Sequence, residues 1–105
     1  MMSLPFLFSF TTSTKVLEAN CPPPVNLNVL SQSSNSISFG WNHSTSAEME
    51  YQMYYIKDGN TSPVYSTVDS GHTFSNLSSG TYHFYFYSVC TPNATSIIIE
   101  ETIFL

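Results

Sequence analysis

The sequence predicts an all-β domain, an antiparallel sandwich of about seven strands, from three observations. Apolar residues recur at every second position within short runs, and turn residues separate these runs. The composition is rich in Ser, Thr, Tyr and Phe and contains only two Lys or Arg, which favours strands over helices. No helical spacing of apolar residues persists for three turns, so the crossover helices that a parallel sheet requires are not predicted.

The first half of the chain supplies three predicted strands. Segment 25–29 alternates aliphatic residues with asparagines after three prolines, so this strand begins where proline no longer blocks pairing. Segment 37–41 places two large rings and an isoleucine on one face, which is the strongest core signal. Segment 51–56 is apolar on both faces. Asp58 and Gly59 follow it and predict a tight turn, because glycine accepts positive φ.

The second half supplies the remaining strands. Segment 64–68 predicts a short edge strand, with Pro63 at its start where no pairing donor is needed. A strand around 74–77 precedes the longest alternating run, 81–89, and branched residues in 97–105 close the domain. The residues predicted to face the core are Ile37, Phe39, Trp41, Tyr51, Met53, Phe74, Leu77, Tyr82, Phe84 and Phe86.

Length and charge exclude several classes of protein. A chain of 105 residues has room for one core. Two Lys or Arg against seven Asp or Glu give a formal charge of −5, so the sequence provides no basic patch for nucleic acid or an anionic membrane. No apolar run reaches the length of a membrane-spanning helix, so an integral membrane protein is not predicted.

The sequence contains no recognisable catalytic or cofactor constellation. His43, His72 and His83 are scattered without the spacing of metal ligands. Glu48 and Glu50 lie close together, but no partner acid or base converges on them in the predicted topology. The chain has no nucleophile-elbow motif and no glycine-rich phosphate loop. We therefore predict a non-catalytic domain without a metal or cofactor.

Residues 1–20 are open to two equal interpretations, and residues 21–105 are assigned to the folded domain. Segment 4–10 has the character of the apolar core of a secretion signal, with cleavage after Ala19. Against a signal, no positive charge precedes this stretch, so the region could equally be an N-terminal extension. A third interpretation is that segment 4–10 adds a strand to an open sheet edge.

Four N-glycosylation sequons begin at asparagines that all fall in predicted turns. Asparagine side chains hydrogen-bond to their own backbone in turns, so turn chemistry is the preferred explanation and glycosylation the alternative. The four asparagines are Asn42, Asn60, Asn76 and Asn93.

An ordered set of motifs resembles the fibronectin type III family. Segment 36–41 has that family's strand-B pattern of a small polar residue, then alternating aliphatic positions, then Trp. The Pro-rich entry 24–29, the Tyr-x-Met-x-Tyr of 51–55, and 77–82 at the corner before the longest strand match in order. One departure is that the corner tyrosine follows Thr directly, where the family usually has one more residue between them. The resemblance covers 21–105 and implies an immunoglobulin-like sandwich.

The resemblance implies a disulfide between Cys21 and Cys90. In the type III topology the first strand begins and the sixth strand ends at the same pole, so a bridge there would join the two sheets. Two buried free thiols are the alternative, and a metal site or a lipid anchor at Cys21 is less favoured. The Cys-Pro-rich start and the second cysteine look most like surface and secreted modules of Bacteroidetes-type bacteria.

The same topology implies an aromatic face, which we define as Tyr54, Ile56, Tyr85 and Tyr87. These residues lie opposite the core positions of two strands that are neighbours in type III domains. Tyrosine joins a large apolar body to a polar tip and is common at recognition surfaces. The alternative is that cross-strand tyrosines only stabilise the sheet.

The predicted function is a non-catalytic extracellular or cell-surface module for adhesion, protein interaction or domain spacing. A carbohydrate-binding module that uses the aromatic face is the alternative. The integrin-binding Arg-Gly-Asp tripeptide of the family does not occur here, because the chain contains no Arg. The expected partner is a protein, a glycan or a neighbouring domain.

Overall fold

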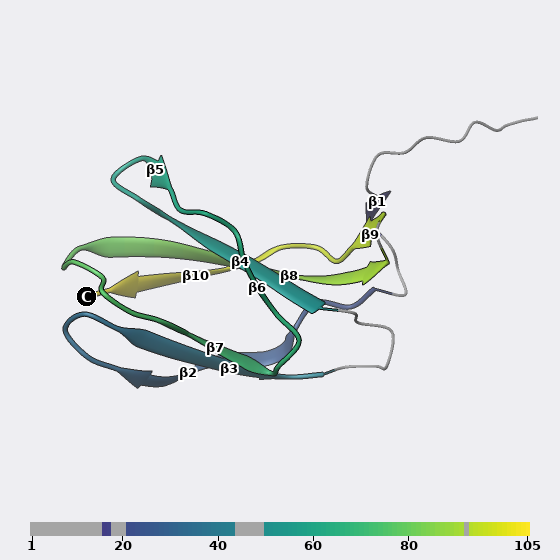
Figure 1. Cartoon of the computed structure of the whole chain (residues 1–105), viewed down its shortest axis with the longest axis horizontal. Helices are drawn as coiled ribbons and strands as arrows, with labels where there is room; N and C mark the ends of the chain where they lie inside the picture. The colour runs from purple at the N-terminus through teal and green to yellow at the C-terminus, as the bar shows by residue number, and fades with distance from the viewer. Residues whose placement is uncertain (1–15, 18–20, 44–49, 92) are drawn as a thin grey trace, which may run out of the picture.

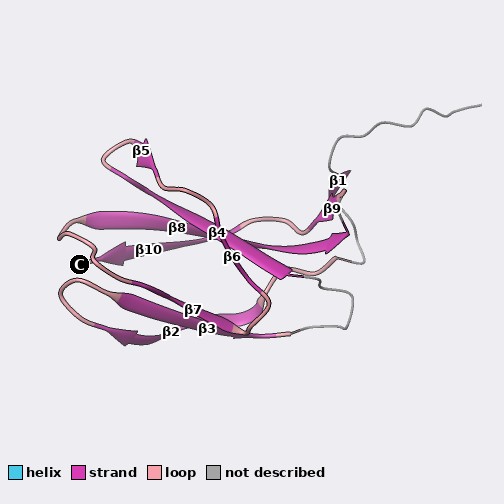
Figure 2. Ribbon diagram, viewed as in Figure 1, coloured by secondary structure: helices cyan, strands magenta, loops and turns pink. Residues whose placement is uncertain are grey.

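The computed structural model describes residues 16–17, 21–43, 50–91 and 93–105, which form two β-sheets that pack face to face (Figure 1). The ribbon consists of strands and loops, and no described residue is helical (Figure 2). Within these residues there is accordingly no helix of the length and hydropathy needed to cross a membrane. The predicted all-β sandwich is confirmed.

The smaller sheet is antiparallel and has the order β2-β3-β7. Its central strand pairs Phe39 with Val29 on one side and with His72 on the other. The inner face of this strand is fully buried, as the alternation of its apolar residues predicts. The bounds of its strands are β2 (Val25–Gln32), β3 (Ile37–Asn42) and β7 (Gly71–Phe74).

The larger sheet is built around two long strands, β4 (Glu50–Lys57) and β8 (Thr81–Thr91), which pair antiparallel along most of their length. The outer edge of β4 pairs with two short strands, and the outer edge of β8 pairs with two others in succession. The short strands are β1 (Val16–Leu17), β5 (Asn60–Thr61), β6 (Tyr65–Thr67), β9 (Ala94–Thr95) and β10 (Ile99–Phe104).

Ten strands are present in the described residues where about seven were predicted. The predicted closing strand 97–105 is shorter, and β9 precedes it on the same edge of β8, so that edge is shared by two strands. β1 and β5 are additional strands of two residues each. β1 pairs with β9 in parallel, which is an exception to the antiparallel prediction. Segment 4–10 lies outside the described residues, so its predicted edge pairing stays a prediction.

Local sequence signals explain the turn after β4. Asp58 and Gly59 both have positive φ, 53° and 79°, which is the geometry of a two-residue turn whose twist matches the flanking strands. Lys57 pairs with Asn60 across this turn. The predicted tight turn is confirmed.

The ten residues predicted to face the core form one buried cluster between the sheets. Phe39 lies at its centre, with ring centroids 5.0 Å from Phe84 and 4.8 Å from Phe86. Trp41 packs edge-on against Tyr51 at 5.3 Å. These edge-to-face arrangements are the favourable ones for aromatic pairs, and they join β3 of one sheet to β4 and β8 of the other.

The corner before β8 forms although it has one residue fewer between Thr81 and Tyr82 than the fibronectin type III pattern usually has. The hydroxyl of Tyr82, which is 2% exposed, donates a hydrogen bond of 2.7 Å to the backbone oxygen of Ser78. The corner is closed further by Gly80, whose backbone exchanges hydrogen bonds of 2.9 and 2.8 Å with Leu105. Gly80 has a φ of 142°, which side chains rarely adopt, so the shorter loop depends on glycine at this position.

Candidate functional site

The aromatic face lies on the outer side of the larger sheet, as predicted. Successive side chains of a strand point to opposite faces, so the buried residues of β4 and β8 alternate with the residues of the aromatic face. The register pairs Tyr54 directly with Tyr85. Tyr87 lies opposite Gln52, and Ile56 lies opposite His83. All four members of the face are half-buried, so each keeps part of its surface in contact with solvent.

Two tyrosines of the face stack on each other. The ring centroids of Tyr54 and Tyr85 are 4.9 Å apart, and the ring planes differ by 19°. A stacked cross-strand pair of this kind stabilises the sheet by about 0.5–1.5 kcal/mol. The alternative that these tyrosines support the sheet therefore has a structural basis, and it is compatible with a second role because both residues keep exposed surface.

A hydrogen-bond chain orients the third tyrosine. The hydroxyl of Tyr87 donates to Gln52 Oε1 at 2.7 Å, and Gln52 Nε2 donates to Glu50 Oε2 at 2.9 Å. Glu50 and Gln52 lie on the same side of β4 as Tyr54 because they precede it at intervals of two. Sequence reasoning did not include them in the face, although the alternation itself contains this signal.

Polar groups of β10 border the other side of the face. Glu100 pairs with Tyr85 across the strands, and Thr102 pairs with His83. His83 Nδ1 lies 3.1 Å from Glu100 Oε2 and 3.2 Å from Thr102 Oγ1. These side chains are exposed, so their contacts contribute little to stability but add hydrogen-bonding groups beside the tyrosine rings.

The environment raises the pKa of two tyrosines of the aromatic face, Tyr85 and Tyr87. Partial burial between neighbouring side chains, followed by the negative charge of Glu100, raises the pKa of Tyr85. Burial, followed by interaction with Tyr54 and the charge of Glu50, raises the pKa of Tyr87. Both phenols therefore remain neutral hydroxyl groups at physiological pH, able to donate and accept hydrogen bonds.

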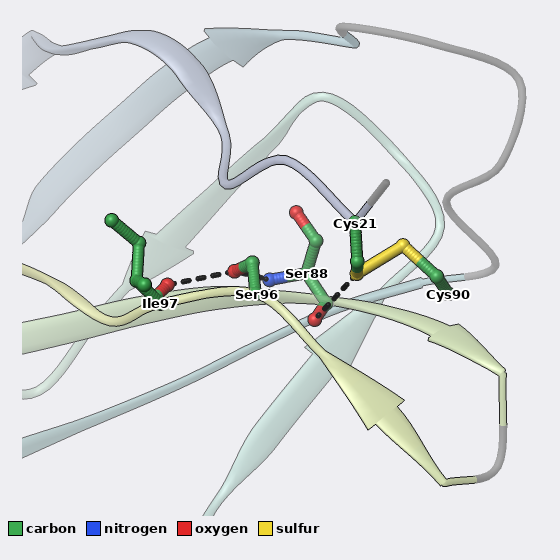
Figure 3. The surroundings of a disulfide bond; sticks show 5 residues. All are labelled: Cys21, Ser88, Cys90, Ser96 and Ile97. Carbon is green, nitrogen blue, oxygen red and sulfur yellow. Dashed lines mark hydrogen bonds between the residues drawn. A yellow bond between two sulfur atoms is a disulfide. The ribbon is translucent and has the colours of Figure 1, made fainter. Parts of the chain in front are cut away.

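The disulfide lies between the start of β2 and the last residues of β8, at the end of the sandwich opposite the β4–β5 turn (Figure 1), and Figure 3 shows its surroundings. Cys21 precedes β2 of the smaller sheet and Cys90 lies in β8 of the larger sheet, so the bond links the two layers. Both cysteines of the chain are used, and neither is a free thiol or available for a lipid anchor.

Two buried serines support the chain beside the bridge (Figure 3). The backbone nitrogen of Ser88 donates to Ser96 Oγ at 2.8 Å, and the hydroxyl of Ser96 donates to Ile97 O at 2.7 Å. Cys21 Sγ lies 3.7 Å from the backbone oxygen of Ser88. Ser88 and Ser96 are 0% and 2% exposed, and these bonds satisfy the buried backbone nitrogen of Ser88 and the hydroxyl of Ser96. The buried Ser88 Oγ itself has no hydrogen-bond partner among the described residues.

The remaining candidate residues do not converge. His43 contacts Tyr51, His72 packs against Phe74, and His83 belongs to the border of the aromatic face. No three His, Cys, Asp or Glu side chains gather as metal ligands in the part of the chain that the structure describes. Glu48, one of the two carboxylates considered above, lies outside the described residues.

The sequon asparagines are all exposed. Asn76 has a φ of 59°, a left-handed conformation that asparagine tolerates in turns. Asn93 lies between β8 and β9. The prediction that all four lie in turns is wrong for the other two: Asn42 ends β3, and Asn60 begins β5 directly after a turn.

Comparison with solved structures identifies the fold. No protein-family model and no curated protein matches the sequence. The crystal structure of FN3tt has a TM-score of 0.66 at 18% identity and covers 80% of this chain and 92% of that chain. Domains d3–d4 of the rat CD45 extracellular region match with a TM-score of 0.67 at 16% identity. This match covers 81% of this chain and 51% of that chain. A myokine structure gives 0.66 at 13% identity, over 79% and 95% of the two chains. The chain therefore has a fibronectin type III-like fold, as its motifs predict.

Proposed function

We propose that this chain is a non-catalytic interaction module that binds a partner protein through the aromatic face. The single observation that supports this most is the stacked pair of Tyr54 and Tyr85, half-exposed and flanked by Gln52 and Glu100. Tyrosines held in place before binding contribute large contact area at little cost in conformational entropy. The polar border supplies the hydrogen bonds that commonly surround the apolar centre of an interface.

The disulfide supports a location outside the reducing cytoplasm. Bonds between cysteines form and persist in secreted and cell-surface proteins, and this one closes a loop across 69 positions. We therefore place the module outside the cell, in adhesion or as a spacer between neighbouring domains. Removal of residues 1–20 as a signal, and the Bacteroidetes-like origin, stay predictions.

A matched pair of variants tests the binding face. Tyr85→Ala removes one ring of the stacked pair, whereas Val68→Ala trims a side chain that is 69% exposed and lies beyond β6. Proteins from the surface of the source cell are cross-linked to the immobilised chain and quantified by mass spectrometry. We expect Tyr85→Ala to lose a specific partner that Val68→Ala retains. Equal recovery by both variants would contradict the assignment of the face.

The carbohydrate-binding alternative predicts a different result. A panel of polysaccharides titrated against tyrosine fluorescence would change the signal of the wild-type chain and not that of Tyr85→Ala. Stacking of Tyr54 on Tyr85 covers one face of each ring, which leaves at most the opposite face of each ring for a sugar. A wild-type chain without any response removes the carbohydrate alternative for this face.

A further inference from the structure

A concave site lies at the end of the sandwich away from the disulfide. It is a cavity of about 330 Å³ between the β4–β5 turn and the connection from β7 to β8, and both segments lie at the same end of the molecule (Figure 1). The lining residues Tyr55 and Lys57 are two positions apart on β4 and alternate with Tyr54 and Ile56. The cavity therefore lies on the opposite face of β4 from the aromatic face.

Lys57 is held in place at this cavity. Its Nζ donates a hydrogen bond of 2.6 Å to Ser78 Oγ and lies 5.5 Å from the centre of the Tyr82 ring. Its aliphatic stem fills the space beside Gly80, where an added Cβ would lie 2.6 Å from Lys57 Cε. The side chain is 20% exposed, so the ammonium group has a defined position with one side open to the cavity.

The charge of Lys57 is only weakly compensated. Asp58 Oδ2 lies 3.7 Å from Nζ, but the Asp58 side chain is 79% exposed, and ion pairs of this kind are worth little in water. Lys57 is also the only Lys or Arg within the described ranges. An ammonium group has three donors, and the bond to Ser78 uses one of them. The other donors suit a carboxylate, which binds them by charge-assisted hydrogen bonds.

The rest of the lining suits hydroxyl groups. Asn60, Thr61 and Asn76 contribute exposed side chains that both donate and accept hydrogen bonds, as sugar hydroxyls do. Tyr55 and Leu77 supply the apolar part of the wall. The volume lies near the lower end of the range for ligand pockets, about 300–1,000 Å³, which fits a single ring.

We propose that this cavity binds a sugar that carries a carboxylate, of the uronic-acid type, with the carboxylate at Lys57 and the hydroxyls at the two asparagines. The ligand is either a free uronic acid or the terminal unit of a polyuronate. This site is separate from the aromatic face and does not depend on the function proposed for that face.

Nuclear magnetic resonance titration of the whole chain with glucuronate tests the proposal. We expect saturable shifts of the amide signals of Lys57 and Asn76, with glucose and acetate binding at least about tenfold more weakly. Lys57→Met keeps the stem and removes the charge, and it should weaken glucuronate binding by about tenfold or more. Asp58→Asn removes the competing carboxylate and should strengthen binding about twofold.

Controls separate this proposal from the others. The unfolding temperature of Lys57→Met shows whether its fold is intact, and Tyr85→Ala should bind glucuronate as the wild type does because Tyr85 lies on the other face. A uronate oligosaccharide that binds more tightly than glucuronate would identify a polymer end as the ligand, and the reverse order a free acid. Equal binding of glucose would overturn the role of charge, and equal binding of acetate would overturn the sugar. Unchanged binding in folded Lys57→Met, or no shift with any uronate, would overturn the proposal altogether.

Discussion

The two faces of the larger sheet use the same strands for different purposes. On the inner side of β8, Phe84 and Phe86 are 0% and 1% exposed and pack against Phe39 of the other sheet. On the outer side, Tyr85 and Tyr87 are half-buried and contact only neighbours within their own sheet in the interactions described above. Burial fixes the inner face, whereas the outer face retains surface and polar groups that binding can use.

Adjacent residues of β8 allow a direct test of this difference. Phe84→Ala leaves a cavity between the sheets and should lower the free energy of unfolding by about 3–5 kcal/mol. Tyr85→Ala removes a stacked ring from a surface and should cost about 1 kcal/mol. Chemical denaturation followed by the fluorescence of Trp41 measures both. Similar losses in the two variants would show that the outer face is as important to the fold as the core.

The disulfide should have the next largest effect after Phe84→Ala, because it adds a covalent cross-link between the two layers that meet at the inner face. The entropy of closing a loop whose ends are 69 positions apart in the sequence predicts a stabilisation of up to about 4 kcal/mol. The double variant Cys21→Ser and Cys90→Ser is compared with the oxidised chain by chemical denaturation. A reduced wild-type chain serves as the control and should match the double variant. An unchanged free energy of unfolding in both would contradict the role of the bridge.

The inner face was predictable from sequence. Side chains of a strand alternate between the two faces of a sheet, so large rings at every second position must all point into the core. Ile37, Phe39 and Trp41 alternate with small residues, so their common direction follows from the strand alone. The same alternation places Gln52 on the side of β4 that carries the aromatic face, beside Tyr54. The position of Glu100 and Thr102 beside the aromatic face could not be predicted, because segment 97–101 contains three isoleucines and two glutamates that do not alternate.

The cavity at Lys57 was not predictable for a different reason. Lys57 and Ser78 are 21 positions apart, and their contact depends on how the β4–β5 turn meets the corner before β8. The corner itself is shorter than the family pattern, yet Tyr82 still reaches Ser78 O. Periodicity predicts which side of a strand a residue occupies, but it does not predict how two loops meet.

The smallest expected effect compares the faces through the ionisation of their tyrosines. Burial, followed by Tyr65 and Tyr82, raises the pKa of Tyr55 on the inner side above its ordinary value of 10.0. The pKa values of Tyr85 and Tyr87 on the outer side are also raised, in each case with burial as the largest cause. In the unfolded chain these phenols lose their protons near pH 10.0, whereas the folded chain holds them to higher pH. The unfolded state then binds fewer protons, so the free energy of unfolding should fall as the pH rises through this window.

Single Tyr→Phe variants assign this loss to one face or the other, since phenylalanine keeps the ring and cannot ionise. Denaturation at pH 8.5, 10 and 11 should give a flatter pH dependence for Tyr55→Phe and for Tyr85→Phe than for the wild type. The flattening should be greater for Tyr55→Phe, because an ionised phenol there would have to leave the core cluster that Tyr55 packs against. A greater flattening of the pH dependence by Tyr85→Phe would show that the outer face is the more tightly packed environment at high pH. The division between a fixed inner face and an available outer face would then not hold for the tyrosines of the larger sheet.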